Sequence, residues 1–224
     1  MRVKEFYEDC WRQEYVPGQG DPSAAERMVR LEAALRPLIA GSRHGRRHVL
    51  DAGCGDGAFL AFLHRVGFQV TGVELAESAA ARARRRCPEA EVRIASLEED
   101  LPFDDGSFDA IWLTEVLEHL FDVHGALAEL NRVLKPGGTL ALTTPYHGKL
   151  KNVLIALVGF EGHFDPDFSP IRFFTRQSLE RCLRRAGFEP VAWQAIGQMW
   201  PVWRSAFVVA RKAGRPLQRP EAAA

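Results

Sequence analysis

The sequence lacks the features that point to a membrane span, a nucleic-acid surface or a disulfide scaffold. Its longest apolar run, residues 153–160, is far shorter than the ~20 residues that cross a bilayer, and residues 1–6 contain no apolar signal segment. Lys plus Arg and Asp plus Glu number 29 each, so no net charge attracts nucleic acid. The four cysteines lie far apart, without the paired spacing of zinc or redox sites. We expect a cytoplasmic protein that binds neither nucleic acid nor a metal ion.

The apolar segments predict one α/β domain preceded by helices. Residues 1–20 place four aromatic side chains at near-helical spacing, and a second helix is expected from Ser23 until Gly41. From His48, short apolar runs alternate with amphipathic stretches, which is typical of a parallel sheet with crossover helices. The expected strands are 48–52, 69–74, 91–95, 108–113 and 138–144, and the expected helices are 57–66, 78–86 and 121–134.

The C-terminal part of the pattern predicts a helix and a hairpin. Thr175 is a suitable cap for a helix through Ala186, which Gly187 closes. Residues 189–196 and 205–211 are apolar stretches joined by a short link, which favours antiparallel pairing. We therefore expect a helical cap (1–44), a main domain (45–212) with an apolar insert (145–174), and a flexible tail (213–224).

A glycine-rich loop follows the first expected strand. Such a loop lets a ligand approach the backbone and the start of the next helix closely. Residues 53–58 also satisfy the looser dinucleotide pattern G-x-G-x-x-G/A, so a nicotinamide or flavin fold is an alternative. Asp51, directly before the glycines, would repel a pyrophosphate but could hold an ammonium group. Glu74 ends the second strand, where a carboxylate can accept ribose hydroxyls in either fold. Asp51 and the closing hairpin favour a cationic cofactor.

Four segments, in this order, resemble the motifs of class I S-adenosylmethionine-dependent methyltransferases. They are residues 49–57 (VLDAGCGDG), 101–109 (LPFDDGSFD), 115–119 (EVLEH) and 132–138 (RVLKPGG). The resemblance covers about residues 45–212 and includes ubiquinone-pathway O-methyltransferases. It implies an α/β, Rossmann-like sheet of seven strands, mostly parallel with an antiparallel final hairpin, and S-adenosyl-L-methionine as the cofactor.

The resemblance also assigns residues to the cofactor. The methionine portion would lie on the glycine loop, the ribose at the second strand, the adenine beside Ser96, and the sulfonium in front of the fourth strand. The family often has Asp where Ser96 stands, which predicts a modestly weaker adenine contact. The expected cofactor-binding residues are Asp51, Gly53, Cys54, Gly55, Glu74, Leu75, Ser96, Leu97, Leu113 and Thr114.

Three histidines follow expected strand ends, where ligands of open α/β sheets bind. His119, His147 and His163 are therefore the candidate general bases for an acceptor hydroxyl. Glu115 and Glu118 share a helical face with His119, and in the resembled ubiquinone-pathway enzymes a similar run is associated with a divalent cation. The same run is widespread in methyltransferases without a metal, so we expect none.

The acceptor is expected to be a small molecule. The insert is unusually apolar, so that it either packs on the sheet or forms a lid with the N-terminal aromatic helix. Trp193, Met199, Trp200 and Trp203 extend this surface, which could instead be a homodimer contact. We expect O-methylation of a quinol, phenol, polyketide or sugar derivative. Nitrogen or carbon methylation, a catalytically silent partner subunit and a nicotinamide dehydrogenase are the alternatives.

Overall fold

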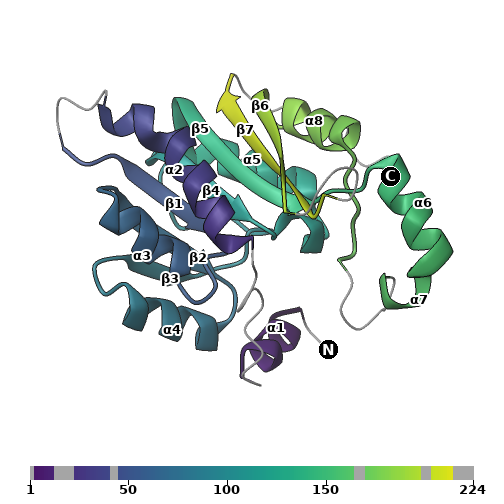
Figure 1. Ribbon diagram of the computed structural model, residues 1–224. Helices are drawn as coiled ribbons and strands as arrows, with labels where there is room; N and C mark the ends of the chain where they lie inside the picture. Colours follow the sequence, from purple (N-terminus) through teal and green to yellow (C-terminus); the bar gives the residue numbers. More distant parts are fainter. Residues whose placement is uncertain (1–2, 13–22, 41–44, 164–169, 198–202, 214–224) are drawn as a thin grey trace, which may run out of the picture.

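The computed structural model describes residues 3–12, 23–40, 45–163, 170–197 and 203–213. Within these ranges the chain forms a seven-stranded sheet of order β3-β2-β1-β4-β5-β7-β6. The strands are β1 (His48–Ala52), β2 (Gln69–Glu74), β3 (Glu91–Ile94), β4 (Phe108–Thr114), β5 (Leu134–Pro145), β6 (Phe188–Ile196) and β7 (Ser205–Lys212). Figure 1 shows this sheet running through the middle of the molecule, with helices on both faces.

The first five strands are parallel, and the last two are antiparallel. Parallel pairing joins β2, β1, β4 and β5 across the centre, where β1 aligns Asp51 with Gly72 and with Trp112. Strand β7 pairs antiparallel with both β5 and β6. This confirms the expected hairpin, which distinguishes the sheet from the dinucleotide fold considered above.

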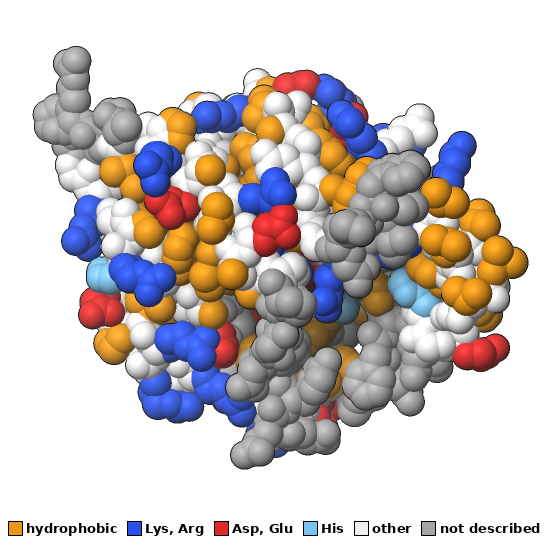
Figure 2. Space-filling model, viewed as in Figure 1, with side chains coloured by type: hydrophobic (Ala, Val, Ile, Leu, Met, Phe, Trp, Pro, Cys, Tyr) orange, Lys and Arg blue, Asp and Glu red, His pale blue; other side chains and the backbone are white. Residues whose placement is uncertain are grey.

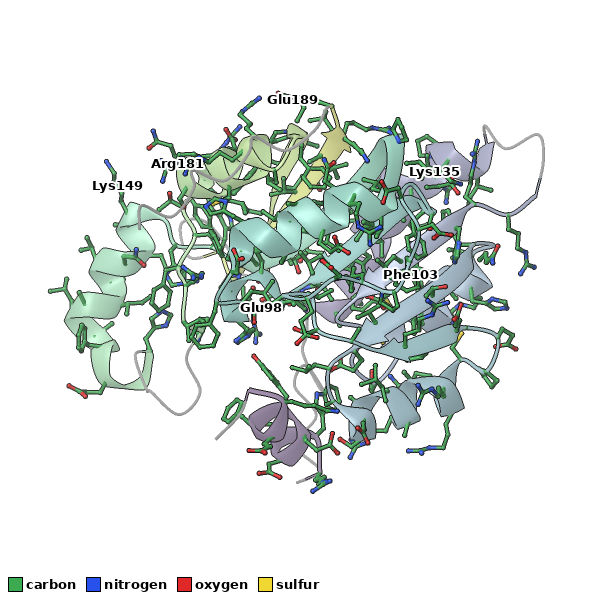
Figure 3. The ribbon with its side chains drawn as sticks, turned by 180° about the vertical axis from the view of Figure 1, so that it is seen from behind. Glu98, Phe103, Lys135, Lys149, Arg181 and Glu189 are labelled. Atoms are coloured by element: carbon green, nitrogen blue, oxygen red, sulfur yellow. The ribbon has the colours of Figure 1, made fainter. Side chains whose placement is uncertain are left out.

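Helices cover the sheet because the central strands are apolar on both faces. On one face pack α2 (Ala24–Ala40) and α3 (Ala58–Arg65), with Trp112 and Phe207 buried beneath them. The opposite face is covered by α5 (Val123–Val133) and α8 (Arg176–Arg185), and Figure 3 shows α5 lying across it. Helix α4 (Glu77–Arg86) packs beside β2 and β3, and α1 (Val3–Arg12) packs on α4.

Most expected boundaries agree with the structure, and the caps explain several of them. Thr175 and Ser178 form a capping box at the start of α8, as its sequence indicates. The Asp122 side chain accepts a hydrogen bond from the Gly125 main chain at the start of α5. The expected helix 121–134 is one residue too long at its C-terminus, because Leu134 already pairs with Phe108 as the first residue of β5. That strand was expected to begin only at residue 138.

The segment after β5 differs most from expectation. It forms α6 (Lys149–Val158) and α7 (Phe160–His163), and no side chain of either helix is buried. Leu157 and Val158 are 74% and 85% exposed, and Figure 2 shows hydrophobic side chains gathered over this part of the surface. The expectation that the insert packs on the sheet is thus wrong for α6. Phe174, which follows the insert helices, is buried.

Several expectations fall on residues outside the described ranges. These are the Pro and Gly break after α1, most of the C-terminal tail, the last of the four N-terminal aromatic residues, Tyr15, and the side chains of Met199 and Trp200. In the part of the chain that the structure describes, no helix is both long and apolar enough to span a bilayer.

Gly57 provides a test of the packing between α3 and α4. Its φ is +81°, and a Cβ added there would lie 2.8 Å from the Ala83 Cα. Gly67 also has a positive φ, +106°, but open space around it. We expect Gly57→Ala to lower the free energy of unfolding by about 2 kcal/mol more than Gly67→Ala, measured by urea denaturation without ligand. Equal losses of unfolding free energy in the two variants would show that α4 moves aside for the added Cβ at no energetic cost.

Candidate cofactor and acceptor site

The loop after β1 is tied to β2 by its backbone. The main-chain N–H groups of Gly53 and Cys54 both donate to the Val73 carbonyl, at 2.8 and 3.0 Å. Gly53 and Gly55 have φ angles of +80° and +52°, which residues with a Cβ rarely adopt. The loop therefore passes close to the end of β2 in a conformation that the two glycines permit.

The Glu74 carboxylate organises this region from the end of β2. One oxygen accepts from the Gly55 N–H at 2.9 Å, and the other accepts from Leu75 and Ala76 at 2.8 and 3.0 Å. Burial raises the pKa of Glu74, while the three N–H donors oppose that rise. Glu74 thus joins the loop after β1 to the turn that begins α4.

Asp51, near the end of β1, has a buried carboxyl group that lacks a stabilising hydrogen-bond partner in the described part of the chain. It is 1% exposed, and neither of its oxygens has a hydrogen-bond partner in the described part of the chain. Burial, together with the nearby Glu74 and Asp56, raises its pKa well above the ordinary value. A ligand with a cationic group would supply the missing partner, whereas a phosphate would add a like charge. The site therefore fits the ammonium of S-adenosylmethionine better than a pyrophosphate.

Helix α1 closes over the glycine loop. A Cβ added to Gly55 would lie 3.2 Å from the Trp11 ring, so this ring rests on the loop. Arg82 of α4 donates to the Trp11 carbonyl at 2.7 Å, and Lys4 forms an ion pair with Glu77 at 2.8 Å. The sequence indicated an aromatic helix here but gave no sign that Trp11 would reach Gly55, because their contact joins separate segments.

The other expected cofactor residues lie around the same strand ends. Cys54 and Leu97 are buried and Leu75 is half-buried. Leu113 is fully buried within the core, and the Thr114 hydroxyl bonds the Thr143 hydroxyl at 2.8 Å. The Ser96 hydroxyl accepts from the Glu98 main chain at 3.1 Å. The structure thus brings these residues to one edge of the sheet, and their contacts with a cofactor stay a prediction.

Only two of the three candidate histidines come together. The rings of His147 and His163 have centroids 5.3 Å apart, and Phe173 lies against both. His119 lies elsewhere, with its ring centroid 6.2 Å from that of Tyr7 on α1. Burial lowers the pKa of each of the three imidazoles. All three therefore favour the neutral form, in which an imidazole can accept a proton.

The acidic run after β4 does not form the expected helical face, because Glu115 has a left-handed backbone and only Leu117–His119 form a turn of 3-10 helix. Glu115 is the one described residue other than glycine with a positive φ, +50°, and its carboxylate lies 3.5 Å from the guanidinium of the buried Arg27. Glu118 is 1% exposed and accepts from the Thr144 hydroxyl at 3.0 Å. Burial, with Glu115 nearby, raises the pKa of Glu118 to about 8. Strain and an unusual protonation state at one place are typical of functional sites.

The Glu118 Oε1 also lies 3.9 Å from the His119 Nε2. Across the described ranges, no group of three His, Cys, Asp or Glu side chains is arranged to hold a metal ion.

Comparison with known proteins agrees with this geometry. The methyltransferase domain family matches residues 50–142. A probable S-adenosylmethionine-dependent methyltransferase of Mycolicibacterium smegmatis is 34% identical over 64% of this chain and 52% of its own. The ubiquinone biosynthesis O-methyltransferase of Xanthomonas campestris is 38% identical over 57% of this chain and 53% of its own. Residues 50–142 thus match a methyltransferase domain, and this part of the chain is similar to S-adenosylmethionine-dependent methyltransferases.

Solved structures support the fold of this methyltransferase domain. The 1,6-didemethyltoxoflavin-N1-methyltransferase of Burkholderia thailandensis, solved with S-adenosylhomocysteine, superimposes with a TM-score of 0.66. The superposition covers 96% of this chain and 92% of that chain at 22% identity, so it bears on the fold alone. The chain spans about half the length of the curated relatives that it matches.

The buried Glu118 should make the stability of the methyltransferase domain depend on pH. Its pKa rises from 4.5 to about 8 on folding, so the folded chain holds a proton that the unfolded chain releases. The free energy of unfolding should therefore fall as pH rises from about 4.5 to about 8, by a few kcal/mol for this group. Glu118→Gln should flatten that fall in urea titrations, whereas the exposed control Glu99→Gln should not. An unchanged slope in Glu118→Gln would show that Glu118 is ionised in the folded chain.

Proposed function

We propose that the chain transfers the methyl group of S-adenosylmethionine to a hydroxyl oxygen of a small, partly apolar metabolite, such as a quinol, phenol, polyketide or sugar derivative. The observation that carries the cofactor assignment is the buried Asp51, whose oxygens have no partner among the described residues. The names of relatives that act as O-methyltransferases support the choice of oxygen.

The bound cofactor would supply a reactive methyl group on a sulfonium. Asp51 would hold the ammonium of its methionine portion, and Gly53 and Gly55 would allow the backbone to approach it. Glu74 would accept hydrogen bonds from the ribose hydroxyls. It would use the carboxylate lone pairs that its three N–H donors leave free. Trp11 would cover the loop and exclude water, which strengthens the attraction between Asp51 and a cation.

The acceptor side is formed by the segments that follow β4 and β5. Tyr146 contacts Trp193 and Trp203, with ring centroids 6.2 and 5.9 Å apart, so aromatic side chains line the end of β5. His147, which follows Tyr146 in the chain, and His163 contact each other and are the candidate proton acceptors. Together these side chains suit an apolar ring that carries a hydroxyl group. The histidine roles and a lid function of residues 145–174 remain part of the proposal.

The proposal is tested by following methyl transfer directly. The protein is incubated with S-adenosylmethionine that carries a trideuterated methyl group and, separately, with 3,4-dihydroxybenzoate, a hydroquinone or an aromatic amine. Mass spectrometry should show the label on oxygen of a hydroxyl acceptor, together with S-adenosylhomocysteine. Label on the amine alone would contradict oxygen as the acceptor atom. Cofactor binding without S-adenosylhomocysteine for any of the acceptors would favour a silent subunit.

Asp51 should release a proton when the cofactor binds. Burial raises the pKa of its carboxyl well above the ordinary value, and a bound ammonium would lower that pKa again by favouring the ionised form. The calorimetric heat of S-adenosylmethionine binding should therefore vary with the ionisation enthalpy of the buffer. S-adenosylhomocysteine, which keeps the ammonium, should behave alike, and Asp51→Asn should abolish the effect and weaken binding by roughly 1–3 kcal/mol. A buffer dependence that persists in Asp51→Asn would assign the proton to another group.

A further inference from the structure

The backbone of His147 is fixed at the end of β5. Its main-chain N–H donates to the Phe174 carbonyl at 3.1 Å, next to a parallel bridge between Tyr146 and Phe174. The residue is 3% exposed although it adjoins α6, whose side chains are largely exposed. The imidazole therefore has a defined place between the sheet and the segment after β5.

The ring of His147 is oriented by one polar contact. Its Nδ1 lies 3.0 Å from the Oδ1 of Asn152 on α6. An amide oxygen can only accept a hydrogen bond, so Nδ1 carries the proton and Nε2 of the neutral ring carries the lone pair. Nε2 is buried and has no hydrogen-bond partner in the described part of the chain. The contact leaves the basic nitrogen available.

The charges around His147 favour this neutral form. Burial has the largest effect and lowers the pKa of His147, and Lys151 on α6 and His163 on α7 lower it further. The Asn152 contact opposes them, because its oxygen also accepts from the imidazolium. Lys151 itself is held in place, since its ammonium donates to the Tyr146 and Trp203 carbonyls at 2.9 and 3.1 Å.

We propose that Asn152 is a positioning residue that fixes His147 with Nε2 as the proton acceptor for the acceptor hydroxyl. The inference rests on the proposed O-methylation. The hydroxyl proton passes to Nε2, an oxygen electron pair forms the bond to the methyl carbon, and the pair of the broken carbon–sulfur bond stays on sulfur. Phe173 packs against the ring of His147 and is 40% exposed, so its displacement would open a path to this ring.

Nitrogen NMR of histidine side chains tests the positioning without any acceptor. In protein labelled with ¹⁵N-histidine at pH 7.5, the signal that disappears in His147→Gln should show Nδ1 protonated and Nε2 bare. Asn152→Ala should move this signal toward the Nε2–H tautomer. Asn152→Asp should raise the pKa of His147 by about one unit or more, because a carboxylate stabilises the imidazolium. Val153→Ala, an exposed neighbour on α6, should change neither property.

Kinetics with whichever hydroxyl acceptor the labelling experiment identifies then tests the base role. Asn152→Ala should lower kcat about 10-fold or more, with KM within twofold. Asn152→Asp should retain activity at high pH and move the acidic limb of the kcat profile to higher pH. A wild-type His147 protonated at Nε2, or an Asn152→Ala signal unchanged from wild type, would overturn the positioning. If wild-type His147 shows the expected tautomer but no hydroxyl acceptor is methylated, the proposed function is refuted instead.

Discussion

The three hydrogen bonds accepted by Glu74 are the constraint on which the proposed cofactor site depends. They join the loop after β1 to the first turn of α4, so that two crossover connections share one buried carboxylate. The loop can follow this path only because Gly53 and Gly55 adopt positive φ angles. Trp11 then rests on the loop from above. The conformation that a cofactor would meet is thus formed before it binds.

The two buried carboxyl groups at this edge of the sheet differ in their surroundings. Glu74 is compensated by backbone donors, whereas Asp51 has no partner among the described residues and a strongly raised pKa. Such a site discriminates by charge, because a cation relieves the cost of burying Asp51 and a phosphate increases it. Glu118, beside β4, is a further buried acid with a raised pKa, but its carboxyl group accepts a hydrogen bond from the Thr144 hydroxyl. The chain therefore buries acids with raised pKa values both near the end of β1 and after β4.

The strands, the hairpin and the glycine loop could be predicted because periodicity and turn residues are local properties of the sequence. Contacts between segments that lie far apart in the sequence could not be predicted in this way. Trp11 on Gly55 and Arg27 beside Glu115 depend on how the N-terminal helices dock, which their own spacing does not indicate. The pairing of His147 with Asn152 depends on α6, whose apolar sequence suggested burial although the helix is exposed. Apolar composition predicts burial only where another element covers it.

Parallel calorimetric titrations with S-adenosylmethionine and NADH test the central claim most directly. Asp51 and the glycine loop predict that S-adenosylmethionine binds with micromolar affinity and that NADH, with its pyrophosphate, does not. Binding of NADH alone would contradict the account, because the end of β1 would then accept a phosphorylated ligand beside a buried acid.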